Sequence, residues 1–258
     1  MDGDKSLHNT NRIDAVHNGT WGRIAGNVRH LVQAGVDVNL LCVVTKQCAA
    51  SPQRVYNALK KLGVGHLQFI ACLDPMEKPR GSMPYSLLPG DYGRFLCHVF
   101  DAWYLDWKNE RYTSVRLFDD YSHLAIGLPA GTCATSGSCG AYFVVEGDGS
   151  IYPCDFYALD EWKMGSVLES DLATLSESRQ ARRFLEDGLE KPEKCRFCNW
   201  LPMCNGGCKR DWVRVDGQLQ NYYCEAFQTF FAYSEQRIRQ IALAELQARR
   251  RFGQMERT

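Results

Sequence analysis

The sequence has no excess charge of either sign, no long apolar run and, in its first residues, no pattern typical of a secretory leader. Its 258 residues include 30 Lys and Arg against 30 Asp and Glu, so no overall field attracts nucleic acid or an anionic membrane. No uninterrupted apolar run reaches the length that spans a bilayer, and the N-terminus lacks a charged segment followed by an apolar one. We therefore expect a globular cytoplasmic protein whose partners include neither nucleic acid nor membrane.

Cysteine, by contrast, is abundant, with twelve residues distributed unevenly. Because a reducing cytoplasm disfavours structural disulfides, clustered cysteines there indicate metal or redox roles. Four cysteines are scattered over the first half, where small buried apolar side chains explain them best: Cys42, Cys48, Cys72 and Cys97. The other eight crowd the second half: Cys133, Cys139, Cys154, Cys195, Cys198, Cys204, Cys208 and Cys224.

The first half alternates between helix and strand patterns. Helices are predicted over 20–34 and 52–62 and around Phe95 to Trp107, and strands over 36–44, 66–73 and 114–118. Such alternation predicts parallel strands joined by crossovers, as in a doubly wound sheet or an α/β barrel. About three strands are too few to close a barrel. We therefore interpret this half as the later part of a larger α/β structure; a small complete three-layer domain is the alternative.

The second half has a different character. The segment "AYFVVEGDGSIYP" (141–153) predicts a hairpin around a Gly-Asp-Gly turn, and short irregular stretches with cysteines follow it. A long amphipathic helix is predicted from about Ala226, with an apolar stripe of Phe227, Phe230, Phe231, Ile238 and Ile241.

The eight clustered cysteines have the spacing of metal ligands. The segment "CRFCNWLPMCNGGC" reads C-x2-C-x5-C-x3-C from Cys195 to Cys208, and Cys224 follows in "NYYC". With the C-x5-C pair at Cys133 and Cys139 and the single Cys154, there are ligands for two four-thiolate sites. Spacing alone leaves zinc and iron-sulfur both open. Chance core packing or a disulfide framework explains the clustering less well.

These segments together resemble a known family. "SCGAYFVVEGDGSIYPCDFY", the C-x2-C-x5-C-x3-C run and "NYYC" are similar to the twin-cluster SPASM module of radical S-adenosylmethionine enzymes. Within that superfamily the chain most resembles the anaerobic sulfatase-maturating enzymes, and the resemblance extends upstream through "LLCVVTK", "LQFIACLDP" and "MPYSLLPGDYGRFL". "MDG" at the start resembles part of the family's Ser-x-Asp-Gly motif.

The resemblance implies an α/β fold in three parts. Residues 1–122 would form the C-terminal part of a partial (β/α)6 barrel, 123–228 an irregular α+β SPASM domain with two clusters, and 229–258 a C-terminal amphipathic helix. The family's radical-generating cluster is held by a C-x3-C-x2-C motif, and this spacing occurs nowhere in the chain. We therefore expect the C-terminal portion of a longer enzyme, inactive by itself.

The resemblance also implies cofactors and ligands. A first auxiliary [4Fe-4S] cluster, nearer the substrate, would be held by Cys133, Cys139, Cys154 and Cys208. A second would be held by Cys195, Cys198, Cys204 and Cys224. S-adenosylmethionine and a third [4Fe-4S] cluster would bind in the longer parent. Arg12 in "NTNRID" and Leu73 in "CLDP" match the family's contacts to S-adenosylmethionine.

The implied reaction oxidises a cysteine or serine of a sulfatase to Cα-formylglycine. A 5′-deoxyadenosyl radical removes a Cβ hydrogen, a base removes the side-chain proton, and the electron leaves through a cluster. Asp155, beside Cys154, matches the family's base, and we expect partial desolvation at the rim of the site to favour proton acceptance. Without the resemblance, a capping or ion-pair aspartate would be an equal explanation.

The implied partners are a sulfatase polypeptide or peptide and an electron donor such as flavodoxin or ferredoxin. One alternative is another SPASM maturase that modifies a ribosomal peptide. A second is a non-catalytic iron-sulfur or zinc protein that transfers electrons or binds a peptide. A neighbouring sulfatase gene would favour sulfatase maturation, and a short precursor-peptide gene would favour the ribosomal-peptide maturase. A complete upstream region without C-x3-C-x2-C would favour the non-catalytic protein.

Overall fold

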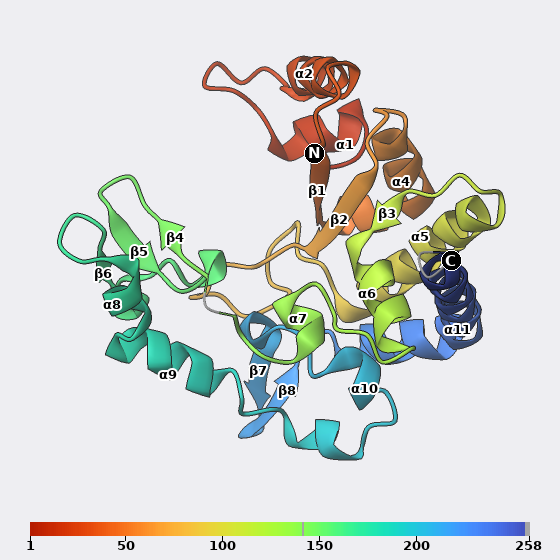
Figure 1. Ribbon diagram of the computed structural model, residues 1–258. Coiled ribbons are helices and arrows are strands. Elements are labelled where there is room, and N and C mark those ends of the chain that lie inside the picture. Colours follow the sequence, from red (N-terminus) through yellow and green to blue (C-terminus); the bar gives the residue numbers. More distant parts are fainter. Residues whose placement is uncertain (141, 256–258) are drawn as a thin grey trace. The chain divides into compact units, whose positions relative to one another are not determined.

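The structure is a computed structural model that describes residues 1–140 and 142–255. It divides into two compact units of mixed α/β structure (Figure 1). Unit 1 comprises Met1–Pro129 together with Tyr222–Thr258, and unit 2 comprises Ala130–Asn221. The C-terminal helix therefore belongs to unit 1, whereas the sequence-based division at 122 and 228 treats it as a separate part.

Unit 1 contains a three-stranded parallel sheet in the order β1-β2-β3. Strand β1 (Asn39–Val44) pairs with β2 (His66–Ala71) along its whole length, and Cys42 lies opposite Phe69. Alternate residues of β1, Leu40, Cys42 and Val44, are buried, as the pleat requires. The predicted parallel arrangement is confirmed, although both strands are shorter than the predicted segments 36–44 and 66–73.

The third predicted strand is mostly wrong. Only β3 (Ser114–Val115) is extended, and helix α6 begins at Arg116. Residues 114–118 alternate in polarity like a strand, but Phe118 and Tyr121 lie three residues apart and are both buried, which is helical spacing. Their rings pack against Phe230 of the C-terminal helix, so tertiary packing determines the helix here.

Unit 1 also contains helices before, between and after these strands. Their bounds are α1 (Lys5–Asn11), α2 (Trp21–Gln33), α3 (Lys46–Ala49), α4 (Pro52–Lys60), α5 (Pro89–Lys108), α6 (Arg116–Leu124) and α11 (Cys224–Met255). The predicted helices at 20–34, 52–62 and 95–107 correspond to α2, α4 and α5, and the predicted C-terminal helix to α11. None of the helices in the described part of the chain is long and apolar enough to span a membrane.

Helix α11 packs against α5 and α6 (Figure 1). Aromatic side chains of these three helices form the core of unit 1. Phe230 of α11 is fully buried and contacts the rings of Phe100, Phe118 and Tyr121 at centroid distances of 5.5 to 5.7 Å. The helices approach closely at Gly93 of α5, where an added Cβ would lie 3.2 Å from the Ala226 Cα. The predicted apolar stripe of α11 therefore lies in the core, except Phe227, which is half-buried.

We expect Phe230→Ala to destabilise unit 1 by about 3 to 5 kcal/mol, because it removes a fully buried ring and leaves a cavity. Urea unfolding followed by tryptophan fluorescence measures this loss. Leu243→Ala on the same helix is the control, since that side chain is 56% exposed and should change stability little. Equal effects of the two substitutions would contradict this account of the core.

Unit 2 is built from short elements. A three-stranded antiparallel sheet contains β4 (Val144–Val145), β5 (Ser150–Tyr152) and β6 (Gly165–Ser166), and a second hairpin contains β7 (Trp212–Val215) and β8 (Gln218–Asn221). The predicted hairpin is confirmed as β4 and β5; Ala141, the first residue of its segment, lies outside the described residues. The α-helices are α7 (Cys133–Ser136), α8 (Leu172–Ser176), α9 (Arg179–Asp187) and α10 (Leu201–Cys204). The 3-10 turns are η1 (Asp155–Tyr157), η2 (Asp160–Trp162), η3 (Glu193–Phe197) and η4 (Lys209–Asp211).

Candidate metal centre

Three thiols of unit 2, those of Cys139, Cys154 and Cys208, lie within electrostatic range of Cys133. Cys133 begins α7, Cys139 follows that helix, Cys154 follows β5, and Cys208 precedes η4. Burial raises the pKa of the Cys154 thiol to about 11 and that of Cys208 to about 12, and Cys133 contributes to both shifts. Burial also raises the pKa of Cys139, with a further contribution from Cys133. Cys133 thus interacts electrostatically with each of the other three residues predicted as the first ligand set.

The side chains of this set are not arranged as finished ligands. Among the described residues, no three His, Cys, Asp or Glu side chains are grouped closely enough to hold a metal ion. The donor set is nevertheless suitable, because four thiolates can hold either an iron-sulfur cluster or zinc. A thiol with a raised pKa is protonated at neutral pH, so metal binding would have to displace the proton.

Glycines keep space beside these cysteines. A Cβ added at Gly188 would lie 2.8 Å from Cys139 Sγ, and one added at Gly137 would lie 2.8 Å from the Asn205 Cβ. Gly137 also has a positive φ of 79°, which ends α7 between Cys133 and Cys139. A side chain at Gly188 would displace the Cys139 thiol, so glycine at this position leaves room for that predicted ligand.

The second predicted ligand set falls on two units. Cys195, Cys198 and Cys204 lie in unit 2 on η3, just after it and at the end of α10, whereas Cys224 is the first residue of α11 in unit 1. After Cys204 the backbone adopts positive φ at Asn205, Gly206 and Gly207. This left-handed run turns the chain sharply between Cys204 and Cys208, which belong to different predicted sets.

Asp155 lies at the start of η1 and is exposed. Our expectation that it is partly desolvated is therefore wrong, because the turn after β5 directs this residue to solvent. The Cys154 thiol donates a hydrogen bond to Asp155 Oδ1 at 3.4 Å. If Cys154 binds metal as a thiolate, this donor proton is lost and Oδ1 becomes available to another donor.

Arg12 and Leu73 lie in unit 1, near the carboxyl ends of its strands. Arg12 follows α1, and its Nε donates to Asp2 Oδ2 at 2.7 Å; Asp2 Oδ1 in turn accepts from the Val43 backbone N–H of β1. Leu73 follows β2 and is half-buried. Cys72 directly precedes Leu73, and its pKa is raised by burial and by Asp74 and lowered by Arg12. Arg12 therefore lies within electrostatic range of the segment that carries Leu73.

Lys209 was not predicted as a site residue. It follows Cys208 directly and is only 8% exposed, in contact with the rings of Tyr157, Trp162 and Phe184. Lysine is almost always at the surface, so the sequence gives no signal for its burial beyond its position next to a predicted ligand.

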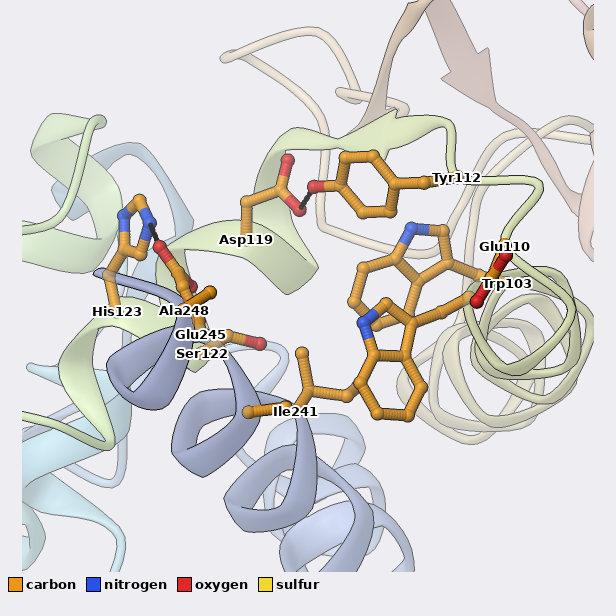
Figure 2. Close-up of a pocket in the computed structure, with 11 residues that line it drawn as sticks. Trp103, Glu110, Tyr112, Asp119, Ser122, His123, Ile241, Glu245 and Ala248 are labelled. Carbon is orange, nitrogen blue, oxygen red and sulfur yellow. Dashed lines mark hydrogen bonds and ion pairs between the residues drawn. The ribbon is translucent and has the colours of Figure 1, made fainter. Parts of the chain in front are cut away.

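Unit 1 also contains a cavity of about 550 Å³ that is lined by none of the site residues described above (Figure 2). Residues of α5, α6 and α11 line it together with the loop before β3. Tyr112 donates to Asp119 Oδ1 at 2.5 Å, and His123 Nε2 lies 3.1 Å from Glu245 Oε1 (Figure 2). None of the predicted site residues lines this cavity. Two of its acids, Asp119 and Glu245, already interact with Tyr112 and His123.

Comparison with known proteins identifies the class first. The SPASM model, described as an iron-sulfur cluster-binding domain, matches residues 137–199, which include Cys139, Cys154, Cys195 and Cys198. The chain therefore carries a SPASM iron-sulfur cluster-binding domain.

The relatives identify the family. Cysteine-type anaerobic sulfatase-maturating enzymes of Clostridium novyi (strain NT) and Clostridium perfringens (strain 13 / Type A) are 38% and 37% identical over 244 residues. These matches cover 94% of this chain and 65% and 66% of the relatives, so the chain spans just under two thirds of their length. A serine-type enzyme of Bacteroides thetaiotaomicron is 24% identical over 90% of the chain and 60% of its own length.

A solved structure agrees with these matches. Native anSMEcpe with bound AdoMet and Kp18Cys peptide superposes with a TM-score of 0.88 at 37% identity, covering 95% of this chain and 68% of that one. The chain belongs to the family of anaerobic sulfatase-maturating enzymes.

Proposed function

We propose that this chain forms part of a radical S-adenosylmethionine enzyme that oxidises one cysteine or serine of a sulfatase to Cα-formylglycine. The observation that carries the proposal is the eight-cysteine constellation within a chain that is 37–38% identical, over 94% of its length, to sulfatase-maturating enzymes. In this proposal unit 1 supplies the later part of a partial (β/α)6 barrel, consistent with its parallel strands.

The chain's cysteines would hold two auxiliary [4Fe-4S] clusters. Cys133, Cys139, Cys154 and Cys208 would hold the first, and the electrostatic effect of Cys133 on the other three thiols supports this grouping. Cys195, Cys198, Cys204 and Cys224 would hold the second. When bound, S-adenosylmethionine and the third cluster of the longer enzyme would supply the hydrogen abstraction, and an auxiliary cluster would accept the released electron. A flavodoxin or ferredoxin would be the external electron donor.

Asp155 would accept the proton of the substrate's side chain. Its carboxylate is exposed and bonded to a thiol proton that ligation of Cys154 removes. Binding of a substrate peptide over this position would exclude water and strengthen its interaction with the substrate donor. Arg12 and Leu73 would contact S-adenosylmethionine, Arg12 through its charge and Leu73 through its apolar side chain.

We propose cysteine rather than serine as the preferred substrate residue. The cysteine-type relatives are 37–38% identical to this chain, whereas the serine-type relatives are 24–26% identical. Mass spectrometry of matched cysteine- and serine-containing sulfatase peptides, incubated with the longer enzyme, would measure this preference.

The metal centre is tested directly on the 258-residue protein. After anaerobic reconstitution we expect about eight irons and eight acid-labile sulfides per chain, because two four-iron clusters require them. Colorimetric iron and sulfide assays measure both. Stoichiometric zinc without labile sulfide would refute the proposed clusters and support the zinc-protein alternative.

A further inference from the structure

Lys209 carries a buried positive charge among the residues proposed to hold the first cluster. Its Nζ donates to the Phe184 carbonyl oxygen at 2.6 Å, and only 8% of the residue is exposed. A buried ammonium group is unfavourable unless it gains hydrogen bonds and a counter-charge. One carbonyl oxygen provides only part of this compensation.

Three aromatic rings fix the position of the charge. Nζ lies 3.4 Å from the ring centroid of Phe184, 5.1 Å from that of Tyr157 and 5.2 Å from that of Trp162. The rings themselves pack edge to face, with centroids 5.3 to 5.7 Å apart. Cation-π attraction and this packing hold the ammonium group in one place rather than letting it reach solvent.

Lys209 lies next to three residues of the first predicted ligand set. It follows Cys208 directly, and its Nζ contacts the ring of Tyr157, whose backbone N–H donates to the Cys154 carbonyl oxygen at 2.9 Å. The Phe184 carbonyl oxygen that accepts from Nζ belongs to α9, and at Gly188, just after this helix, an added Cβ would lie 2.8 Å from Cys139 Sγ. These thiols are neutral while protonated, so they provide a counter-charge to Lys209 when they bind metal as thiolates.

We propose that Lys209 sets the reduction potential of the cluster held by Cys133, Cys139, Cys154 and Cys208. This inference rests on the proposed function. One-electron reduction adds a negative charge to the cluster, and a fixed positive charge nearby stabilises the reduced form more than the oxidised form. Lys209 thereby favours transfer of the electron released by substrate oxidation onto this cluster; no bond forms or breaks at the lysine.

The size of the effect follows from Coulomb's law. At an effective dielectric constant near 20 and a separation of about 12 Å, one unit charge changes the reduction equilibrium about tenfold. For a one-electron couple this is about 59 mV. Lys209 is thus a positioning residue that acts through charge, and its effect is measurable without catalytic turnover.

The test is a redox titration of the reconstituted 258-residue protein, monitored by electron paramagnetic resonance. The transition lost in Cys208→Ala identifies the first cluster. We expect Lys209→Met to lower the midpoint potential of that transition by about 59 mV, whereas Lys209→Arg should keep it near the unmodified value. Lys194→Met is the control, because Lys194 lies beside Cys195 but its amine is exposed to water, which screens its charge.

An unchanged potential in Lys209→Met with full iron would overturn the proposal, as would an equal shift in Lys194→Met. Lys209→Gln gives the same measurement if Lys209→Met does not retain iron. Loss of the cluster in all three Lys209 variants would also overturn it, because the lysine would then be needed to build the site. A complete absence of labile sulfide in the unmodified protein would instead refute the proposed function.

Discussion

Replacing Asp155 with asparagine in the longer enzyme is expected to lower formylglycine formation by about a hundredfold to ten-thousandfold. Asparagine keeps the shape of the side chain and leaves Cys154 in place, but it has no carboxylate to accept a proton. Hydrogen abstraction precedes the loss of that proton in the proposed reaction. 5′-Deoxyadenosine should therefore still form, uncoupled from product.

Quantifying both products by mass spectrometry separates the two steps. Asp148→Asn is the matched control, since Asp148 is also an exposed aspartate of unit 2 but lies in the β4–β5 turn, where it accepts hydrogen bonds from Ser150. It should retain normal product formation. If Asp155→Asn makes formylglycine at the normal rate, the proton is accepted elsewhere; if it loses iron, Asp155 supports Cys154 structurally.

Substitution of single cysteines should remove one cluster at a time. We expect Cys154→Ala and Cys208→Ala each to retain about four of about eight irons, because the first cluster loses a ligand while the second does not. Unit 2 has short strands and irregular turns, so loss of the cluster should also destabilise it. Iron assays and hydrogen exchange over 130–221 measure the two effects.

Two further variants make this experiment specific. Cys195→Ala should retain the other half of the iron, and Cys97→Ala should retain all of it, because Cys97 is a buried residue of α5 outside both proposed sets. Full iron content in both Cys154→Ala and Cys208→Ala would show that the ligand assignment is wrong.

The sequence predicts the periodic elements of this protein better than its irregular ones. Helices α2, α4 and α5 and the order of parallel strands follow from apolar spacing that burial then enforces. The segment 114–118 is too short for its pattern to distinguish strand from helix. Only the distant rings of α11 determine that Phe118 and Tyr121 share a helical face.

The candidate site shows the same limit. Cysteine spacing indicates the ligand-bearing segments, and the structure brings three thiols of the first set within electrostatic range of the fourth, Cys133. The sequence pattern does not predict that Asp155 is exposed or that Lys209 is buried, because each depends on how one turn of unit 2 directs a single side chain. Division of the second set between units also depends on tertiary structure, since Cys224 is only three residues from the end of β8.

Because the chain returns to unit 1 through α11, unit 1 cannot complete its core early in protein synthesis. Residues 130–221 emerge from the ribosome before Phe230 and Phe231, which complete the aromatic core of α5 and α6. Unit 1 therefore stays incomplete until α11 has been translated, with buried rings of α5 and α6 exposed to aggregation. A truncated chain that ends before α11 would keep this apolar surface exposed permanently, so α11 sets the shortest useful C-terminal boundary.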